Sequence, residues 1–258
     1  MGMDILLLGT ATAVAAGLTL FSGFGLGTLL LPVFALFVPM PAAVALTAVV
    51  HLLNNLFKLA LLGRHADRRV VWRFGAPALV GAWVGARWLI ALDDLPALAT
   101  YQLFGAAREV LPVNAVVAGL MMVFALAELR PAATPSTAGP WVLPLGGVVS
   151  GLFGGLSGHQ GAFRSAALAA YGVSKETFLG TGIVIACLVD TVRLTVYGGR
   201  VMTEVGAHGP LVAVAVASAF GGVWVGARLL PHVAMPAIRR LVAIGLILIA
   251  VGLAGGWL

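Results

Sequence analysis

Polar side chains that could bind an anion interrupt an apolar stretch in the second half of the sequence. The segment 156–166 reads LSGHQGAFRSA and supplies Ser157, His159, Gln160 and Arg164. We expect a helix to begin inside this segment, with Arg164 near its N-terminus, where the helix dipole already carries about half a positive charge. An anion would relieve that repulsion by binding the guanidinium and the free N–H groups of the helix end. The alternatives are an arginine that extends to the membrane interface or pairs with Asp190.

A related segment without charged side chains lies in the first half of the sequence. Residues 21–32 read FSGFGLGTLLLP and supply Ser22, Gly23, Gly25, Gly27 and Thr28. The glycines predict a helix break, and irregular backbone at membrane depth is tolerated only inside protein or along a wet cavity. We interpret the two breaks as facing each other across a binding site, to which this one contributes N–H groups and hydroxyls. Alternatively, its glycines only allow two helices to cross closely.

Two charged residues lie in the middle of the apolar segment 177–197. Asp190 and Arg193 are three residues apart, which places them on one face of a helix. Ionisable residues inside membrane helices usually have a function, so Asp190 could exchange a proton or hold Arg193 toward a transport pathway. An intrahelical ion pair that only neutralises the two charges fits the spacing equally well.

The corresponding region of the first half has a polar set of its own. It contains His51, Asn54, Asn55 and Lys58. Polar groups at matching places in both halves predict one central pathway. His51 is either a buried, hydrogen-bonded residue or one that titrates near neutral pH, and Lys58 is expected to extend to the cytoplasmic interface. Thr47 and Thr181 follow the two breaks and either line the site or bond back to their own helices.

Composition restricts the class of protein. The chain has 258 residues, of which 61% are hydrophobic and 9% charged, and its mean hydropathy is +1.07. Soluble domains carry about 25% charged residues, so the sequence predicts an all-α polytopic membrane protein. It has no HExxH, CxxC or P-loop motif, and we expect no enzyme activity, cofactor or metal site. The net charge of +6 lies in short loops and within apolar segments, which fits a lipid bilayer and not a nucleic acid.

The apolar segments follow the same order in each half. In the first half they are 4–22, 28–38, 42–62, 74–92 and 110–129, and in the second 141–156, 162–172, 177–197, 210–230 and 241–258. At about 1.5 Å per residue, 28–38 and 162–172 are too short to cross a bilayer, so we interpret them as half-helices after the breaks. Loops are expected at 63–73, 198–209 and 231–240, and an acidic, then amphipathic segment at 93–109.

A sequence repeat supports this division. Residues 80–89 read VGAWVGARWL and residues 221–230 read GGVWVGARLL, which indicates duplication. We expect a first transmembrane repeat at 1–130, a cytoplasmic linker at 131–140 and a second repeat at 141–258. Arg87 and Arg228 occupy matching positions and are expected to anchor their helices at the interface.

The basic residues predict the orientation of the repeats. Loop 63–73 contains Arg64, Arg68, Arg69 and Arg73 and is therefore expected in the cytoplasm. The equivalent loop, 198–209, has only Arg200 as a fixed positive charge and is expected outside. Equivalent loops on opposite sides indicate inverted topology, each repeat being a broken helical hairpin plus three transmembrane helices.

The glycine pattern resembles that of the sulfite exporter TauE/SafE family of membrane permeases. The residues that carry the resemblance are Gly23, Gly25, Gly27 and Pro32, followed by Ala45, Leu46 and Thr47, with a second copy from Gly151 to Thr181 and the VGAR helices. Three departures are Ala166 in place of the family's second proline, His159 and Gln160 where glycines are usual, and Ala48 and Gly182 where a serine follows each threonine. The resemblance implies transport, often outward, of sulfite, sulfonates or other sulfur-containing anions.

The sequence thus predicts a multi-pass secondary transporter of the bacterial inner membrane. It would export a small sulfur-containing anion by alternating access around a midplane site formed by the two broken hairpins. A passive anion channel is the alternative. The expected partners are the small anion and the lipid bilayer, and the sequence leaves a homo-oligomer open.

Overall fold

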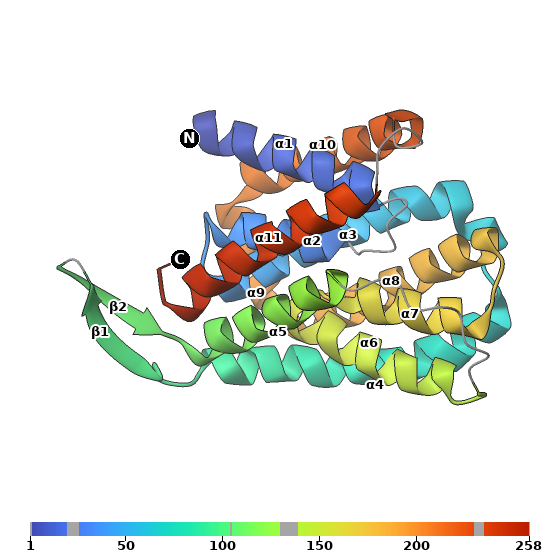
Figure 1. Ribbon diagram of the computed structural model, residues 1–258, viewed down its shortest axis with the longest axis horizontal. Coiled ribbons are helices and arrows are strands. Elements are labelled where there is room, and N and C mark those ends of the chain that lie inside the picture. The colour runs from blue at the N-terminus through green and yellow to red at the C-terminus, as the bar shows by residue number, and fades with distance from the viewer. Residues whose placement is uncertain (1, 20–25, 104, 130–138, 230–234, 258) are drawn as a thin grey trace.

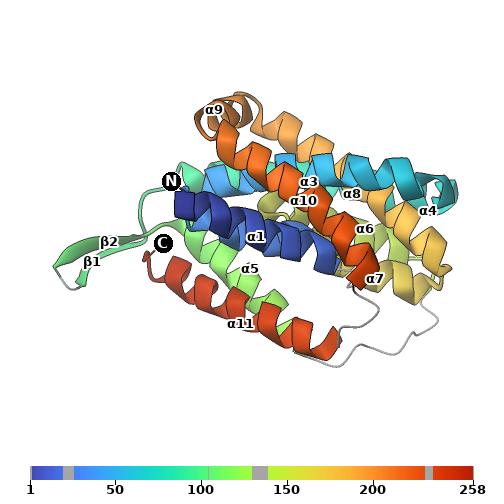
Figure 2. The same ribbon diagram turned by 90° about the horizontal axis from the view of Figure 1, so that it is seen from above.

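The computed structural model describes residues 2–19, 26–103, 105–129, 139–229 and 235–257. Within these ranges the chain forms eleven α-helices, a short 3-10 helix at Gly63–His65 and one β-hairpin. Figures 1 and 2 show the helices side by side in one elongated body, with the hairpin projecting beyond one end, near the C-terminus.

The helices follow the order of the apolar segments. Those of the first half are α1 (Gly2–Thr19), α2 (Leu26–Ala35), α3 (Met40–Leu62), α4 (Arg68–Asp93) and α5 (Pro112–Glu128). Those of the second half are α6 (Val142–Ser157), α7 (Gln160–Tyr171), α8 (Lys175–Tyr197), α9 (Gly199–Ala207), α10 (Gly209–Leu229) and α11 (Met235–Ala254). Among the described helices, α3, α4, α8 and α10 are long and apolar enough to cross a membrane. The prediction of an all-α polytopic membrane protein is confirmed.

Three connecting segments differ from the expectation. The expected loop 198–209 contains α9, in which Val201 and Val205, one helical turn apart, pack on the apolar core. The expected loop 231–240 is helical from Met235 onward, because α11 begins there. Most of a β-hairpin lies in the segment 93–109. It consists of β1 (Ala99–Leu103) and β2 (Ala106–Val110) and turns at Gly105, which has a φ of 79°.

The hairpin is fastened to the end of the chain. The Tyr101 hydroxyl donates to the carbonyl oxygen of Gly255, and the Trp257 indole donates to the Tyr101 oxygen over 2.8 Å. An isolated two-stranded hairpin is marginally stable in water, so these contacts with the residues after α11 help to hold it.

Small residues allow two pairs of helices to approach closely. On α6, Gly147, Gly151 and Gly155 lie against the backbone of Phe74, Ala78 and Ala82 on α4. On α10, Gly222 and Gly226 lie in the same way against Ala13 and Gly17 of α1, and Figure 2 shows α1 and α10 side by side. A Cβ at Gly151 would overlap the Ala78 carbonyl. Such small-residue contacts suit a lipid environment, where helix association depends on close packing.

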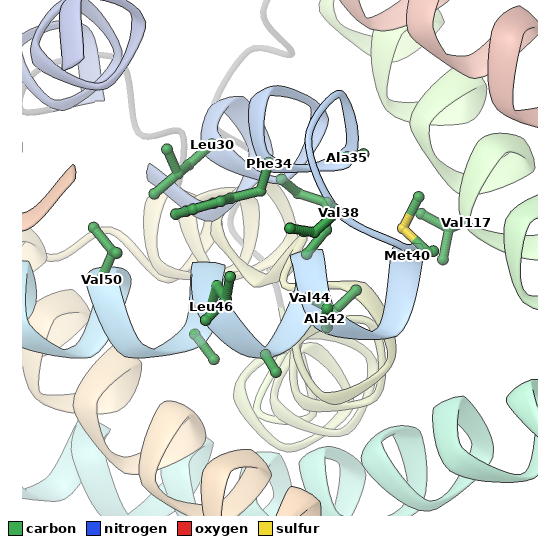
Figure 3. Close-up of a cluster of buried hydrophobic side chains, with 14 of the residues drawn as sticks. Leu30, Phe34, Ala35, Val38, Met40, Ala42, Val44, Leu46, Val50 and Val117 are labelled. Atoms are coloured by element: carbon green, nitrogen blue, oxygen red, sulfur yellow. The ribbon is translucent and has the colours of Figure 1, made fainter. Parts of the chain in front are cut away.

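The main apolar core lies where α2 covers α3. Figure 3 shows Leu30 and Phe34 of α2 directed toward α3, which carries Leu46 and Val50, with Met40 against Val117 of α5. All of these side chains are buried. This packing fixes α2, whose first turn contains Gly27 and Thr28, against the helix that carries the polar residues His51 to Lys58.

We expect Gly151→Val to destabilise the protein by about 1–3 kcal/mol or more, because the added side chain must separate α6 from α4. Thermal unfolding of the protein in detergent measures the effect as a lower Tm. Gly119→Val is the matched control, because Gly119 is an exposed helical glycine on α5 and a Cβ added there would meet no atom of another described element within 4 Å. Equal melting temperatures for the two variants would contradict the close packing of α4 and α6.

Candidate functional site

The second predicted break is present. Helix α6 ends at Ser157, Gly158 has a φ of 81°, and α7 begins at Gln160 and runs for only 12 residues. The left-handed conformation of Gly158 favours glycine. A Cβ there would also lie 2.8 Å from Nη1 of Arg193. The break therefore depends on glycine both for its backbone and for its contact with a buried cation.

The described part of the first break lies against the second. A Cβ at Gly27, in the first turn of α2, would lie 2.9 Å from the carbonyl oxygen of Gly158. Gly27 and Thr28 are both buried. Ser22, Gly23 and Gly25, which we also predicted to contribute to the site, lie outside the described residues.

Asp190 gathers polar groups from three helices beside this contact. Its carboxylate is fully buried and accepts a hydrogen bond of 2.6 Å from Nδ1 of His51 on α3 and one of 3.1 Å from Nε2 of Gln160 on α7. Nη2 of Arg193, on its own helix α8, lies 3.0 Å from Oδ1 of Asp190. Asn55 donates to the same carboxylate over 3.5 Å. The structure thus brings together polar residues that lie far apart in the sequence.

Arg193 connects Asp190 to the break. Its Nη1 donates to the Gly154 carbonyl of α6 over 3.3 Å. The same carbonyl also accepts from the N–H of Gly158 over 2.9 Å. Carbonyl groups at a helix C-terminus carry partial negative charge, so a guanidinium is well placed there. The ion pair with Asp190, which the sequence left as one interpretation, is present and is part of this larger network.

Arg164 is linked to Asp190 indirectly. It is half-buried, and its Nη1 donates to Oε1 of Gln160 over 3.3 Å, while the amide nitrogen of Gln160 donates to Asp190. The guanidinium also passes close to Gly182 of α8, where an added Cβ would lie 3.4 Å from Nε. Gln160 therefore orients Arg164 and leaves most of its guanidinium donors to other partners.

His159 and Ser157 face a different neighbour. Nδ1 of His159 lies 2.9 Å from the Ser157 hydroxyl, and the His159 ring stacks on Phe124 of α5 with centroids 4.8 Å apart and an interplanar angle of 6°. Among the described residues, Nε2 of His159 has no hydrogen-bond partner. Ser157 and His159 therefore have different partners from Arg164, although all three belong to one short segment.

One face of α3 is polar along its length. Thr47, His51, Asn54 and Lys58 recur at helical spacing and are all buried. The expectation that Lys58 extends to the interface is wrong, because its side chain is only 7% exposed. Helix α3 is an inner helix, packed by α2, α8 and α10, so a lysine on this face is enclosed by protein.

The two threonines have different surroundings. Thr181 accepts a hydrogen bond of 3.0 Å from the backbone N–H of Asp67, so it fastens the loop before α4. Asp67 itself caps α4 by accepting from the N–H groups of Arg69 and Val70. Thr47, in contrast, is fully buried, and its hydroxyl has no partner in the described part of the chain.

Asp190→Asn should destabilise the protein by about 3–5 kcal/mol, because it leaves Arg193 buried without its counter-charge. Thermal unfolding in detergent measures the change. Asp93→Asn is the control: Asp93 pairs with the exposed Arg200 at 2.8 Å, and such surface pairs contribute about 0–1 kcal/mol. In the double variant Asp190→Asn/Arg193→Met much of the stability should return. A single variant as stable as the control would show that the network does not support the fold.

Comparison with known proteins places the chain in a family. No curated protein and no solved structure matches it. The family model described as sulfite exporter TauE/SafE matches residues 6–253. Because that match spans nearly the whole chain, the protein belongs to the sulfite exporter TauE/SafE family, a family of multi-pass membrane transporters and not of enzymes.

Proposed function

We propose that the protein carries a small sulfur-containing anion, such as sulfite or an organosulfonate, outward across the bacterial inner membrane. The single observation that supports this most directly is the charge around Asp190 and Arg164. Among the described residues there, Arg193, Arg164 and Lys58 are cations, and Asp190 is the one carboxylate. Unbalanced charge inside a membrane protein is unfavourable and usually functional. A bound anion would balance it.

The proposed site lies at the start of α7. Gln160 and Gly161 begin this helix, whose first N–H groups lack helical partners and suit an anion's oxygen atoms. Arg164, one turn later, would bind the anion through its guanidinium, which can form two parallel hydrogen bonds with an oxyanion. The small residues Gly27 and Thr28 of the first break would shape the opposite wall.

The remaining predicted residues take other roles in the proposal. Helices α3 and α8 would be held together beside the anion by His51, Asn55 and Asp190. Arg193 would stabilise the break through its contacts with α6. Asn54 and Thr47 would line the pathway along α3. Thr181 is bonded to Asp67, and Ser157 is bonded to His159, whose ring stacks on Phe124. We leave these three residues out of the binding site.

We further propose that residues 1–130 and 141–258 are two inverted repeats joined by a cytoplasmic linker. Reciprocal packing supports the duplication, because α4 of the first half packs on α6 and α10 of the second half packs on α1. The matching motif also recurs in structure: Arg87 lies 6.0 Å from the Trp83 ring and Arg228 lies 3.7 Å from the Trp224 ring. Rocking of the two halves about the break contact would give alternating access.

Uptake of radiolabelled sulfite and organosulfonates into liposomes tests this function. We expect saturable uptake by the unmodified protein and a loss of about tenfold to a hundredfold in kcat/KM for Arg164→Ala, the size of a lost charge-assisted hydrogen bond. Arg164→Lys should be intermediate, because it keeps the charge without the paired donors.

Arg87→Ala is the matched control and should transport normally, because Arg87 is exposed beside Trp83. Full transport by Arg164→Ala would remove Arg164 from the site. A flux that rises linearly with anion concentration, with single-channel currents in planar bilayers, would favour a passive channel over a carrier.

A further inference from the structure

The polar face of α3 carries buried polar atoms that have no hydrogen-bond partner among the described residues. Thr47, Asn54 and Lys58 are separated by seven and four residues, so at 100° per residue they lie within about 40° of arc on the helix. All three are more than nine-tenths buried. In the described part of the chain, the Thr47 hydroxyl and both polar atoms of the Asn54 amide have no hydrogen-bond partner. Buried polar atoms without partners are rare, and each one needs an explanation.

Lys58 places a second positive charge beside Arg164. The two side chains come from α3 and α7, which both pack on α8. The end of α3 and the start of α8 lie at the same end of the molecule, because the 3-10 helix after α3 packs on α8 and Asp67 bonds Thr181. Counted from the 2.6 Å contact between His51 and Asp190, Lys58 lies two turns further along α3, and Arg164 lies beside Gly182, about two turns earlier on α8. Among the described residues, no carboxylate forms an ion pair with Lys58. Asp190 attracts Arg164 but is already bound by His51, Gln160 and Arg193.

The charges around this position do not cancel. Arg193 balances Asp190, which leaves Lys58 and Arg164 as two positive charges even when His51 is neutral. A monoanion between them would leave one of the two enclosed charges uncompensated, whereas a dianion would compensate both. Buried charges are stable only when they are paired and hydrogen-bonded.

We propose that Lys58 and Arg164 form a two-cation subsite that selects dianions over monoanions. The inference rests on the proposed transport function and narrows its substrate class to oxyanions in the doubly charged state. Lys58 and Arg164 bind the anion from two sides, and the Asn54 amide, one helical turn from Lys58, donates to one of its remaining oxygen atoms. Thr47 lies about 16 Å from Lys58 along the helix axis and so outside this subsite. For sulfite, which exchanges between a monoanion and a dianion near neutral pH, the dianion is the bound form.

Competition against radiolabelled sulfite in liposomes tests the selectivity. Sulfate and methanesulfonate are suitable probes, because they have similar size and tetrahedral shape and differ in one unit of charge. We expect sulfate to inhibit sulfite uptake at least tenfold more strongly than methanesulfonate. In Lys58→Met this ratio should fall by about tenfold, the size of one lost charge-assisted contact, whereas Lys58→Arg should keep it.

Lys175→Met is the control, because Lys175 is exposed at the start of α8, and its ratio should match that of the unmodified protein. If Lys58→Met does not fold, the ratio of sulfate to methanesulfonate inhibition in the unmodified protein still tests the proposal. Methanesulfonate that inhibits as strongly as sulfate, or more strongly, overturns it. An unchanged ratio in a folded Lys58→Met protein overturns it as well. Saturable sulfite uptake in these same assays would leave the transport function standing, whereas its absence in the unmodified protein contradicts that function itself.

Discussion

The arrangement of the polar interior depends on the buried carboxylate of Asp190. A carboxylate that leaves water must find hydrogen-bond donors or counter-charges, and Asp190 finds them on α3, α7 and its own helix α8. Its position therefore fixes three helices relative to one another. Arg193, paired with it, lies against Gly158 and bonds the last turn of α6. Through Gln160 the same carboxylate orients Arg164. The break, the ion pair and the proposed anion site are thus parts of one network.

Glycine makes this network sterically possible. In lipid, helices associate through close packing, and α4 with α6 and α1 with α10 approach through small residues. The contact between Gly27 and Gly158 is of the same kind, but it lies at the ends of α2 and α6 and so brings backbone groups that lack helical partners to one place. Larger residues at either position would separate the two halves of the proposed site.

The sequence predicted the features that depend on local composition. The break at Gly158 follows from glycine and polar residues in an apolar stretch. The spacing of Asp190 and Arg193 offered their ion pair as one of two interpretations. The sequence also predicted that the polar sets of both halves meet, because they occupy matching places. It could not show that His51 is the residue that reaches Asp190, since that depends on how α3 rotates against α8. The function of the predicted site residues stays a prediction.

Features that depend on the packing of neighbouring helices could not be predicted from the sequence. Lys58 has the position of a lysine that extends to the interface, and only the packing of α2, α8 and α10 around α3 encloses it. Helix α9 was interpreted as a loop because nine residues are too few for a clear helical pattern. The stacking of His159 on Phe124 joins residues 35 positions apart and has no local signal.

The contacts of His159 and Gln160 show that the break is held more strongly on one side than on the other. They are adjacent, yet His159 stacks on Phe124 of α5 and Gln160 donates to Asp190 of α8. An aromatic stack contributes about 0.5–1.5 kcal/mol, whereas a hydrogen bond to a buried charge contributes about 1.5–3 kcal/mol. Stacked rings can also slide, but a buried carboxylate that loses a donor keeps the cost of its desolvation. If the two halves rock about the break, with the contact between His51 and Asp190 as part of the pivot, α7 should therefore move with α8 and slide over α5. Arg164 would then stay beside Asp190 throughout the movement, while the wall formed by α5 changes around the anion.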